Sequence, residues 1–203
     1  MKLYYLPGAC SLAPHIALRE VGATFELDRL DKASKKTESG VDFLTVNPKG
    51  YVPALSLDDG DLLTENASIL QFIADANPSA ALAPAAGTRE RVRLQEHLNF
   101  IATELHKSFS PLFAPGSSDE MKAAARKKVA QRLDLVEKWL ADGRSYLLGD
   151  TFSVADAYLF TVVNWTFPTS ISLAPWPHVA AYHQRVAARD SVKAALKAEG
   201  LAA

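Results

Sequence analysis

The single cysteine is the residue whose type and position point most directly to chemistry. Cys10 follows a short apolar strand and stands at the start of a helix predicted over residues 11–21. A helix N-terminus carries unpaired N–H groups and a partial positive charge, which favour a thiolate over a thiol. A thiolate here is a nucleophile or a partner for another thiolate. The alternative is that Cys10 is a small buried apolar residue.

No second cysteine is present to resolve a disulfide formed at Cys10. In a Cys-x-x-Cys motif the resolving thiol stands three residues later, and that position holds Ala13. Disulfide chemistry at Cys10 therefore requires a thiol from another molecule, such as glutathione. A lone cysteine also excludes an internal disulfide and a cysteine-rich zinc site, and the histidines show no metal-ligand spacing, so no metal is predicted.

Two further segments of the N-terminal part contain residues that could bind a ligand. If the Val52–Pro53 bond is cis, the Val52 N–H and C=O face outward and can pair with an extended peptide; a trans proline at a strand start is the alternative. Glu65 and Asn66 open a predicted helix. They either cap it or form a carboxylate-binding terminus in which Glu65 takes an ammonium group.

A histidine and a lysine form the candidate pair of the C-terminal part. His106 and Lys107 lie at the edge of the apolar stripe of a long amphipathic helix predicted over residues 89–113. From there they can point into a cleft, or they are a surface pair. Ser153 and Asp156 match a capping box ahead of an apolar run, for which we prefer a structural role.

The predicted elements change in type near residue 80. The first part mixes strands and helices in the order β-α-β-α-β-β-α, and the second is helical. Predicted strands cover 3–6, 24–30, 53–57 and 62–64. Predicted helices cover 11–21, 41–46, 65–76, 89–113, 119–141, 153–167, 176–189 and 190–199.

Composition excludes several classes of protein. A formal net charge of −1 argues against nucleic-acid binding through a basic field. The N-terminus lacks the pattern of a signal peptide. The longest apolar stretch, 154–167, is shorter than the roughly 20 residues of a membrane-spanning helix. We therefore expect a cytoplasmic protein without membrane association.

Taken together, the sequence resembles the cytosolic glutathione S-transferases, most closely the bacterial beta class. The resemblance covers the whole chain, and each segment that carries it stands in the family's order. The segments are KLYYLPGACSLAPHIALRE, NPKGYVPAL, LTENASILQFIAD, NFIATELHKSFSPLF and FSVADAYLF.

The resemblance implies an α/β thioredoxin-like domain followed by an all-α helical domain. The implied boundaries are a glutathione-binding domain at 1–77, a linker at 78–87 and a helical domain at 88–203 that forms the hydrophobic co-substrate site. It also implies glutathione as co-substrate, a homodimer, and glutathione sites near the subunit interface.

The resemblance also assigns roles to individual residues. Cys10 faces the glutathione sulfur and can form a mixed disulfide with it; Cys10 and His106 are the candidate catalytic residues. Val52 and Pro53 present backbone to the cysteinyl part, Glu65 and Asn66 hold the γ-glutamyl end, and Lys35 approaches the glycyl carboxylate. His106 and Lys107 line the site, while Asn99 and Thr103 reach the glutathione of the partner subunit. The candidate co-substrate residues are Tyr5, Phe109, Phe113 and Trp165.

The function predicted from these residues is glutathione transfer to small hydrophobic electrophiles. The enzyme lowers the pKa of the glutathione thiol with hydrogen bonds from Cys10, Ser11 and the helix N-terminus, and His106 donates a hydrogen bond or carries charge. One alternative is a glutathione-dependent thiol–disulfide reductase or dehalogenase that passes through a Cys10–glutathione disulfide. Another is a non-catalytic glutathione- or ligand-binding protein.

Overall fold

The computed structural model describes residues 1–201 and divides the chain into two compact units. The first unit contains Met1–Ala81 and the C-terminal segment that begins at Ala188, and the second contains Leu82–Ala187. Our domain boundaries at 77 and 88 stay a prediction. Within residues 1–201, no helix is both long and apolar enough to cross a membrane.

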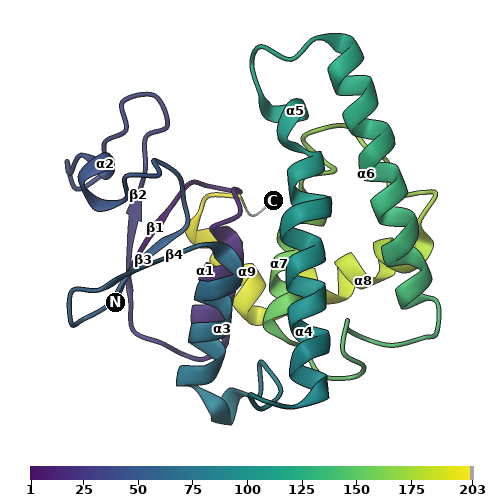
Figure 1. The fold of residues 1–203 in the computed structure, drawn as a ribbon, viewed down its shortest axis with the longest axis horizontal. Coiled ribbons are helices and arrows are strands. Elements are labelled where there is room, and N and C mark those ends of the chain that lie inside the picture. The colour runs from purple at the N-terminus through teal and green to yellow at the C-terminus, as the bar shows by residue number, and fades with distance from the viewer. Residues whose placement is uncertain (202–203) are drawn as a thin grey trace. The chain divides into compact units, whose positions relative to one another are not determined.

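A mixed four-stranded sheet forms the centre of the first unit (Figure 1). The strands are β1 (Lys2–Tyr5), β2 (Glu26–Arg29), β3 (Ala54–Ser56) and β4 (Leu62–Thr64), in the spatial order β2-β1-β3-β4. β1 pairs in parallel with β2, and the pairs β1–β3 and β3–β4 are antiparallel. Because side chains alternate along a strand, Leu3 and Tyr4 are buried on opposite faces of this sheet.

Helices complete the first unit in the predicted order. They are α1 (Leu12–Glu20), α2 (Phe43–Val46), α3 (Asn66–Ala76), the short 3₁₀ helix η1 (Pro78–Ala80) and α9 (Asp190–Ala198). Tyr4 packs against Phe43 of α2 with ring centroids 5.5 Å apart. Helix α1 packs against both α3 and α9. The sequence therefore predicted the β-α-β-α-β-β-α order correctly.

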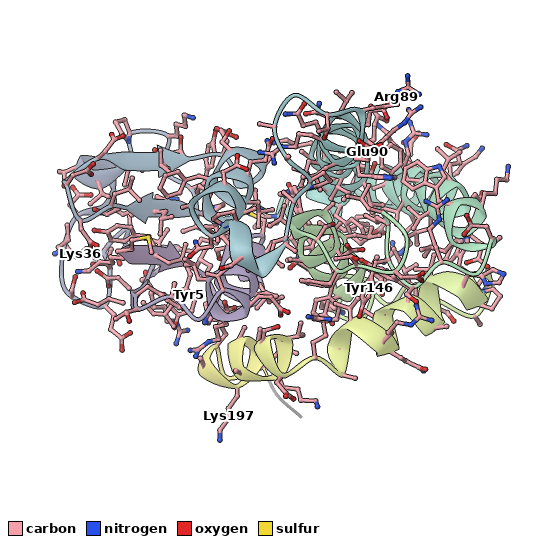
Figure 2. The ribbon with its side chains drawn as sticks, turned by 90° about the horizontal axis from the view of Figure 1, so that it is seen from below. Tyr5, Lys36, Arg89, Glu90, Tyr146 and Lys197 are labelled. Carbon is pink, nitrogen blue, oxygen red and sulfur yellow. The ribbon has the colours of Figure 1, made fainter. Side chains whose placement is uncertain are left out.

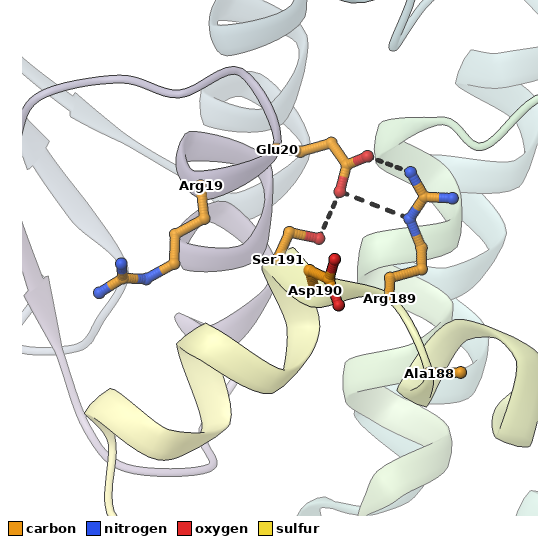
Figure 3. A pocket seen from close by; sticks show the side chains of 6 residues that line it. All are labelled: Arg19, Glu20, Ala188, Arg189, Asp190 and Ser191. Carbon is orange, nitrogen blue, oxygen red and sulfur yellow. Dashed lines mark hydrogen bonds and ion pairs between the residues drawn. The ribbon is translucent and has the colours of Figure 1, made fainter.

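Polar contacts anchor both ends of α9 to α1. At its start, the Glu20 carboxylate accepts hydrogen bonds from the Arg189 guanidinium and the Ser191 hydroxyl (Figure 3). These groups line a surface depression of about 380 Å³. Just past its end, Glu199 is buried, whereas Lys197 projects outward into solvent (Figure 2). The helix is therefore fixed at each terminus to a segment far away in the sequence.

The buried end of this connection reaches the loop before Cys10. Glu199 accepts a hydrogen bond from the Gly8 N–H at 2.8 Å and pairs with Nδ1 of His15 at 2.8 Å. The side chains of His15 and Glu199 are both fully buried. Inside the same loop, the Ser11 hydroxyl bonds to the backbone N–H and C=O of Leu6. The loop that carries Cys10 is thus stabilised by the Ser11–Leu6 hydrogen bonds within it and by the Gly8–Glu199 hydrogen bond to the C-terminal segment.

The second unit is helical. Its elements are α4 (Arg89–Phe100), the π-helical segment η2 (Ile101–His106), α5 (Ser110–Phe113), α6 (Asp119–Leu140), α7 (Val154–Asn164) and α8 (Pro177–Ala187). α7 packs against α4, η2 and α8, and all its residues from Val154 to Val163 are buried. This confirms the expectation that the apolar run forms a core helix.

The prediction of a single helix over residues 89–113 is wrong in detail, because the helix is interrupted between His106 and Ser110. The helix continues as η2, in which the hydrogen bonds span one more residue than in an α-helix, and α5 begins anew with a proline in its first turn. Near the break, the Ser108 hydroxyl donates to the C=O of Glu104. The apolar spacing continues through both segments, so periodicity alone does not reveal the interruption.

The predicted capping box at the start of α7 is present. The Asp156 carboxylate accepts hydrogen bonds from the Ser153 N–H and hydroxyl at 2.9 and 2.7 Å, and from the Leu147 N–H at 2.9 Å. It also accepts from the Tyr182 hydroxyl at 3.0 Å. Asp156 is fully buried, and burial raises the pKa of its carboxyl group despite these donors.

We predict that Asp156→Ala destabilises the protein strongly, because it leaves several buried donors without an acceptor. Each such donor costs about 1–3 kcal/mol, so we expect a loss of roughly 3 kcal/mol or more in the free energy of unfolding. Urea denaturation measures this loss. Asp150→Ala removes an exposed carboxylate nearby and serves as the control, with an expected change within about 0.5 kcal/mol. Equal losses in both variants would contradict the anchoring role.

Candidate glutathione site

Within the first unit, the structure brings Cys10, Val52 and Asn66 together. The Cys10 thiol is partly buried, and Sγ lies 3.3 Å from the C=O of Val52. The Asn66 side chain donates through Nδ2 to the C=O of Cys10 at 3.0 Å. The Val52–Pro53 peptide bond is cis, as one of the two sequence hypotheses required. Residues far apart in sequence therefore meet around one cysteine.

Asn66 has one polar atom with no partner. Its Oδ1 is buried and makes no hydrogen bond within residues 1–201, while its Nδ2 is engaged by Cys10. A buried acceptor without a donor is costly, so this position favours a ligand or water that supplies an N–H or O–H group. Asn66 is also the first residue of α3, where unpaired N–H groups favour an anion. An α-amino acid group offers both charges.

Glu65 precedes this helix in an uncommon backbone conformation. Its φ of 69° lies in the left-handed region, which costs roughly 1–2 kcal/mol for a residue other than glycine. Its side chain makes no capping hydrogen bond to α3. Instead, the carboxylate pairs with Nζ of Lys49 at 2.6 Å, and this bond raises the pKa of Lys49. Such strain persists where the surroundings impose it, which is typical of binding sites.

Two lysines contact the loop that runs from α2 to Pro53, Lys49 from within the loop and Lys35 from the segment before α2. Nζ of Lys35, which we predicted near a glycyl carboxylate, donates to the C=O of Gly50 at 2.9 Å. Lys49 also donates to the Thr64 hydroxyl at 3.0 Å. Sequence reasoning missed Lys49, because its partners lie in another segment and the NPKG motif marks it only as a turn residue. Both cations lie beside the loop that leads to Val52.

One sequence expectation in this unit needs correction. Ser11 was expected to offer a hydrogen bond to bound glutathione, but it is completely buried and both its donor and acceptor capacities serve Leu6. It is therefore a loop-closing residue. Tyr5 is buried as well, and burial is the main cause that raises the pKa of its phenol.

In the second unit, His106 is the centre of an aromatic cluster. Nδ1 of His106 lies 2.7 Å from the Tyr158 hydroxyl. The His106 and Trp165 rings meet edge to face at 4.7 Å, and Trp165 contacts Phe109 and Phe113, each at 5.6 Å. Phe109 is fully buried and supports Trp165, whereas Phe113 is 43% exposed. Of these predicted co-substrate residues, Phe113 offers the most accessible surface.

The electrostatics of His106 favour one of its two expected roles, hydrogen-bond donation, over the other, which was to carry charge. Burial, with a smaller contribution from Lys107, lowers the pKa of His106 to about 4. The imidazole is therefore neutral near pH 7 and can donate or accept a hydrogen bond without a net charge. Asn99 and Thr103, which we predicted to reach a partner subunit, are exposed on α4 and η2. The Thr103 hydroxyl donates to the Asn99 C=O at 2.9 Å.

Comparison with known proteins identifies the family. Residues 8–76 match the model of the glutathione S-transferase N-terminal domain, and residues 100–190 match that of the C-terminal domain. Glutathione S-transferase GstA of Escherichia coli O157:H7 is 48% identical over 201 residues, which cover 99% of this chain and 100% of the relative. The chain belongs to the glutathione S-transferase family.

Among solved structures, the chain is similar to bacterial glutathione S-transferases. BphK, a bacterial glutathione S-transferase solved as a ternary complex, superposes with a TM-score of 0.97 at 58% identity, covering 99% of this chain and 100% of that one. A beta-class enzyme from Sphingomonas chungbukensis has a TM-score of 0.96 at 55% identity over 99% and 100% of the chains. The predicted family and fold class are confirmed. Within residues 1–201, no group of three or more Asp, Glu, His or Cys side chains is arranged so that it could hold a metal ion.

We predict that the His106 ring titrates near pH 4, which NMR measures as the midpoint of its imidazole shifts. Lys107→Ala should raise this midpoint slightly, because it removes a nearby positive charge but leaves the larger effect of burial. His183 provides an internal control, since burial alone lowers its pKa to about 4 and Lys107→Ala should leave it unchanged. A His106 midpoint at the ordinary value of about 6.5 would show that the ring is solvated.

Proposed function

We propose that this chain catalyses the attack of the glutathione thiol on small hydrophobic electrophiles. Membership of the glutathione S-transferase family supports this activity. The observation that carries it is the unpartnered Oδ1 of Asn66 beside Glu65, at the N-terminus of α3 and one hydrogen bond from Cys10. A sphingomonad relative at 55% identity was solved with glutathione bound.

The γ-glutamyl end of glutathione suits this cluster. Its α-ammonium group can donate to Asn66 Oδ1 and pair with the Glu65 carboxylate, while its α-carboxylate lies at the first N–H groups of α3. In this arrangement Lys49 keeps the local charge balanced as it does in the free protein. The ligand then satisfies an acceptor that the protein alone leaves without a donor.

The cysteinyl and glycyl parts follow from the same anchor. We assign the Val52 backbone beside Pro53 to the cysteinyl part; the Val52 C=O has a second lone pair besides the one directed at Cys10. Lys35 is assigned to the glycyl carboxylate. This arrangement brings the glutathione sulfur to Cys10.

The chemical step needs a thiolate and an electrophile. The glutathione thiol releases its proton to solvent, and its sulfur forms a bond to an electrophilic carbon as the leaving group departs with its bonding electrons. A neutral His106 donates a hydrogen bond to the sulfur anion, and the Cys10 thiol donates a second when its S–H turns from the Val52 C=O to the bound sulfur. Lys107 adds positive potential. Trp165 and Phe113 provide an apolar surface for the electrophile, with the buried Phe109 as support. Tyr5 is the proposed co-substrate residue of the first unit.

The proposal includes a homodimer, in which Asn99 and Thr103 contact the glutathione bound by the partner subunit. Both side chains are exposed on one continuous helical segment, which fits a contact with a second chain. The chain is proposed to act in the cytoplasm, where a single reduced cysteine is stable.

We predict that the Glu65 carboxylate recognises the α-ammonium group of glutathione. Calorimetry should compare glutathione with its glutaryl analogue, which lacks only that ammonium group, on wild type and Glu65→Gln. Wild type should bind glutathione at least roughly tenfold more tightly than the analogue, and Glu65→Gln should reduce this ratio markedly. The same ratio in both proteins would contradict the assignment.

Lys49→Met is the control for this cycle, because it breaks the same ion pair from the other side. It should change the affinity for both ligands by a similar factor and keep their ratio. If Lys49→Met instead reproduces the Glu65→Gln result, loss of the ion pair explains the effect, and Glu65 does not recognise the ligand directly.

The alternative of a thiol–disulfide reductase or dehalogenase is not favoured by the relatives, which carry transferase names. Cys10 nevertheless allows a test of the mixed disulfide. Oxidised glutathione and the Cys10 thiol exchange to give Cys10-S-S-glutathione and one free glutathione. We predict that intact-mass spectrometry finds one added glutathionyl group, which a reductant removes and Cys10→Ala abolishes. No mass gain in the wild-type protein would argue against contact between Cys10 and the glutathione sulfur.

A further inference from the structure

The two ring nitrogens of His106 have different environments. Nδ1 lies 2.7 Å from the Tyr158 hydroxyl, and the two rings are nearly perpendicular, with centroids 6.0 Å apart. Nε2 makes no hydrogen bond with any residue of the described range 1–201. The Trp165 ring, at 4.7 Å, limits rotation of the imidazole from another side. The ring is therefore held in one orientation with one nitrogen available.

Tyr158 is well placed to impose this arrangement. It lies on α7, the core helix of the second unit, and is only 2% exposed. α7 is fixed at its start by the capping box of Ser153 and Asp156. A buried phenol is normally kept in a core only where its hydroxyl finds a partner, and here that partner includes His106.

The chemistry of the pair sets the direction of the hydrogen bond. A phenol hydroxyl is more acidic than a neutral imidazole N–H, and an imidazole nitrogen is the more basic acceptor. The favoured bond therefore runs from the Tyr158 hydroxyl to Nδ1, and the ring proton then resides on Nε2. With the opposite tautomer, Nε2 would be an acceptor and could not donate to a sulfur anion.

We infer that Tyr158 is a positioning residue that fixes His106 as the Nε2–H tautomer, so that His106 presents a neutral hydrogen-bond donor to the glutathione thiolate. The thiolate part of this inference rests on the proposed function. The tautomer does not, because it follows from groups within the second unit alone.

The tautomer is tested by ¹⁵N NMR of the imidazole rings at pH 7 in the ligand-free protein. In wild type, we expect Nδ1 of His106 to show the shift of an unprotonated ring nitrogen and Nε2 that of a protonated one. In Tyr158→Phe the two shifts should move toward each other, because both tautomers become populated. A protonated Nδ1 in wild type, or unchanged shifts in Tyr158→Phe, overturns the inference.

The matched control is Tyr182→Phe, which also removes one hydroxyl from a buried tyrosine of this unit. The Tyr182 hydroxyl bonds to Asp156 and does not contact His106. Tyr182→Phe should therefore leave the His106 shifts unchanged. A similar change in both variants would indicate general loosening of the second unit and would overturn the specific role of Tyr158.

The functional part is tested by titrating the thiolate absorbance of bound glutathione. Tyr158→Phe should raise the apparent pKa of the bound thiol and lower kcat by roughly tenfold, with a smaller change in KM for glutathione, while Tyr182→Phe should not. An unchanged thiol titration together with altered NMR shifts overturns the role toward the thiolate. If wild type binds no glutathione, the proposed function fails, and the NMR result still decides the tautomer.

Discussion

Each unit of this protein is organised around a carboxylate that is buried away from water and surrounded by hydrogen-bond donors. In the first unit, Glu199 holds the Gly8 N–H and His15. In the second, Asp156 holds donors from three positions, among them Tyr182. A carboxylate buried without partners costs several kcal/mol, so each carboxylate and its donors are stable only when assembled together. This requirement fixes segments that are distant in sequence.

The same constraint reaches the candidate functional groups. Gly8 is two residues before Cys10, so the contact with Glu199 restrains the loop that presents the thiol. Tyr158 is two residues after Asp156 on the same helix, so the capping box restrains the phenol that contacts His106. In each unit, a buried acid supports a candidate functional group that is only partly buried. The division is physically reasonable, because burial that rigidifies the support would hinder access to the reactive group.

The predictability of these features depends on sequence separation. The capping box spans four consecutive residues, Ser153 to Asp156, and was visible as a local pattern. The pair of His15 and Glu199 spans nearly the whole chain, so no local signal marks it, and His15 was given no role. Tyr158 lies inside an apolar run, and the pattern of that run predicts burial but not the hydrogen bond to His106. The π-helical segment before Lys107 was missed because its apolar spacing resembles that of an α-helix.

The depressed pKa of His106 decides how it can act on a thiol. Moving a proton from a thiol of pKa about 8.5 to an imidazole of pKa about 4 costs about 6 kcal/mol. The attraction between the resulting ions, 4 Å apart at an effective dielectric constant of about 20, returns about 4 kcal/mol. The ion pair is therefore less stable than the neutral pair by about 2 kcal/mol, which favours His106 as a hydrogen-bond donor over His106 as the base. A fixed N–H dipole involves no such transfer, which makes the identity of the tautomer, and hence Tyr158, more important than the charge of the histidine.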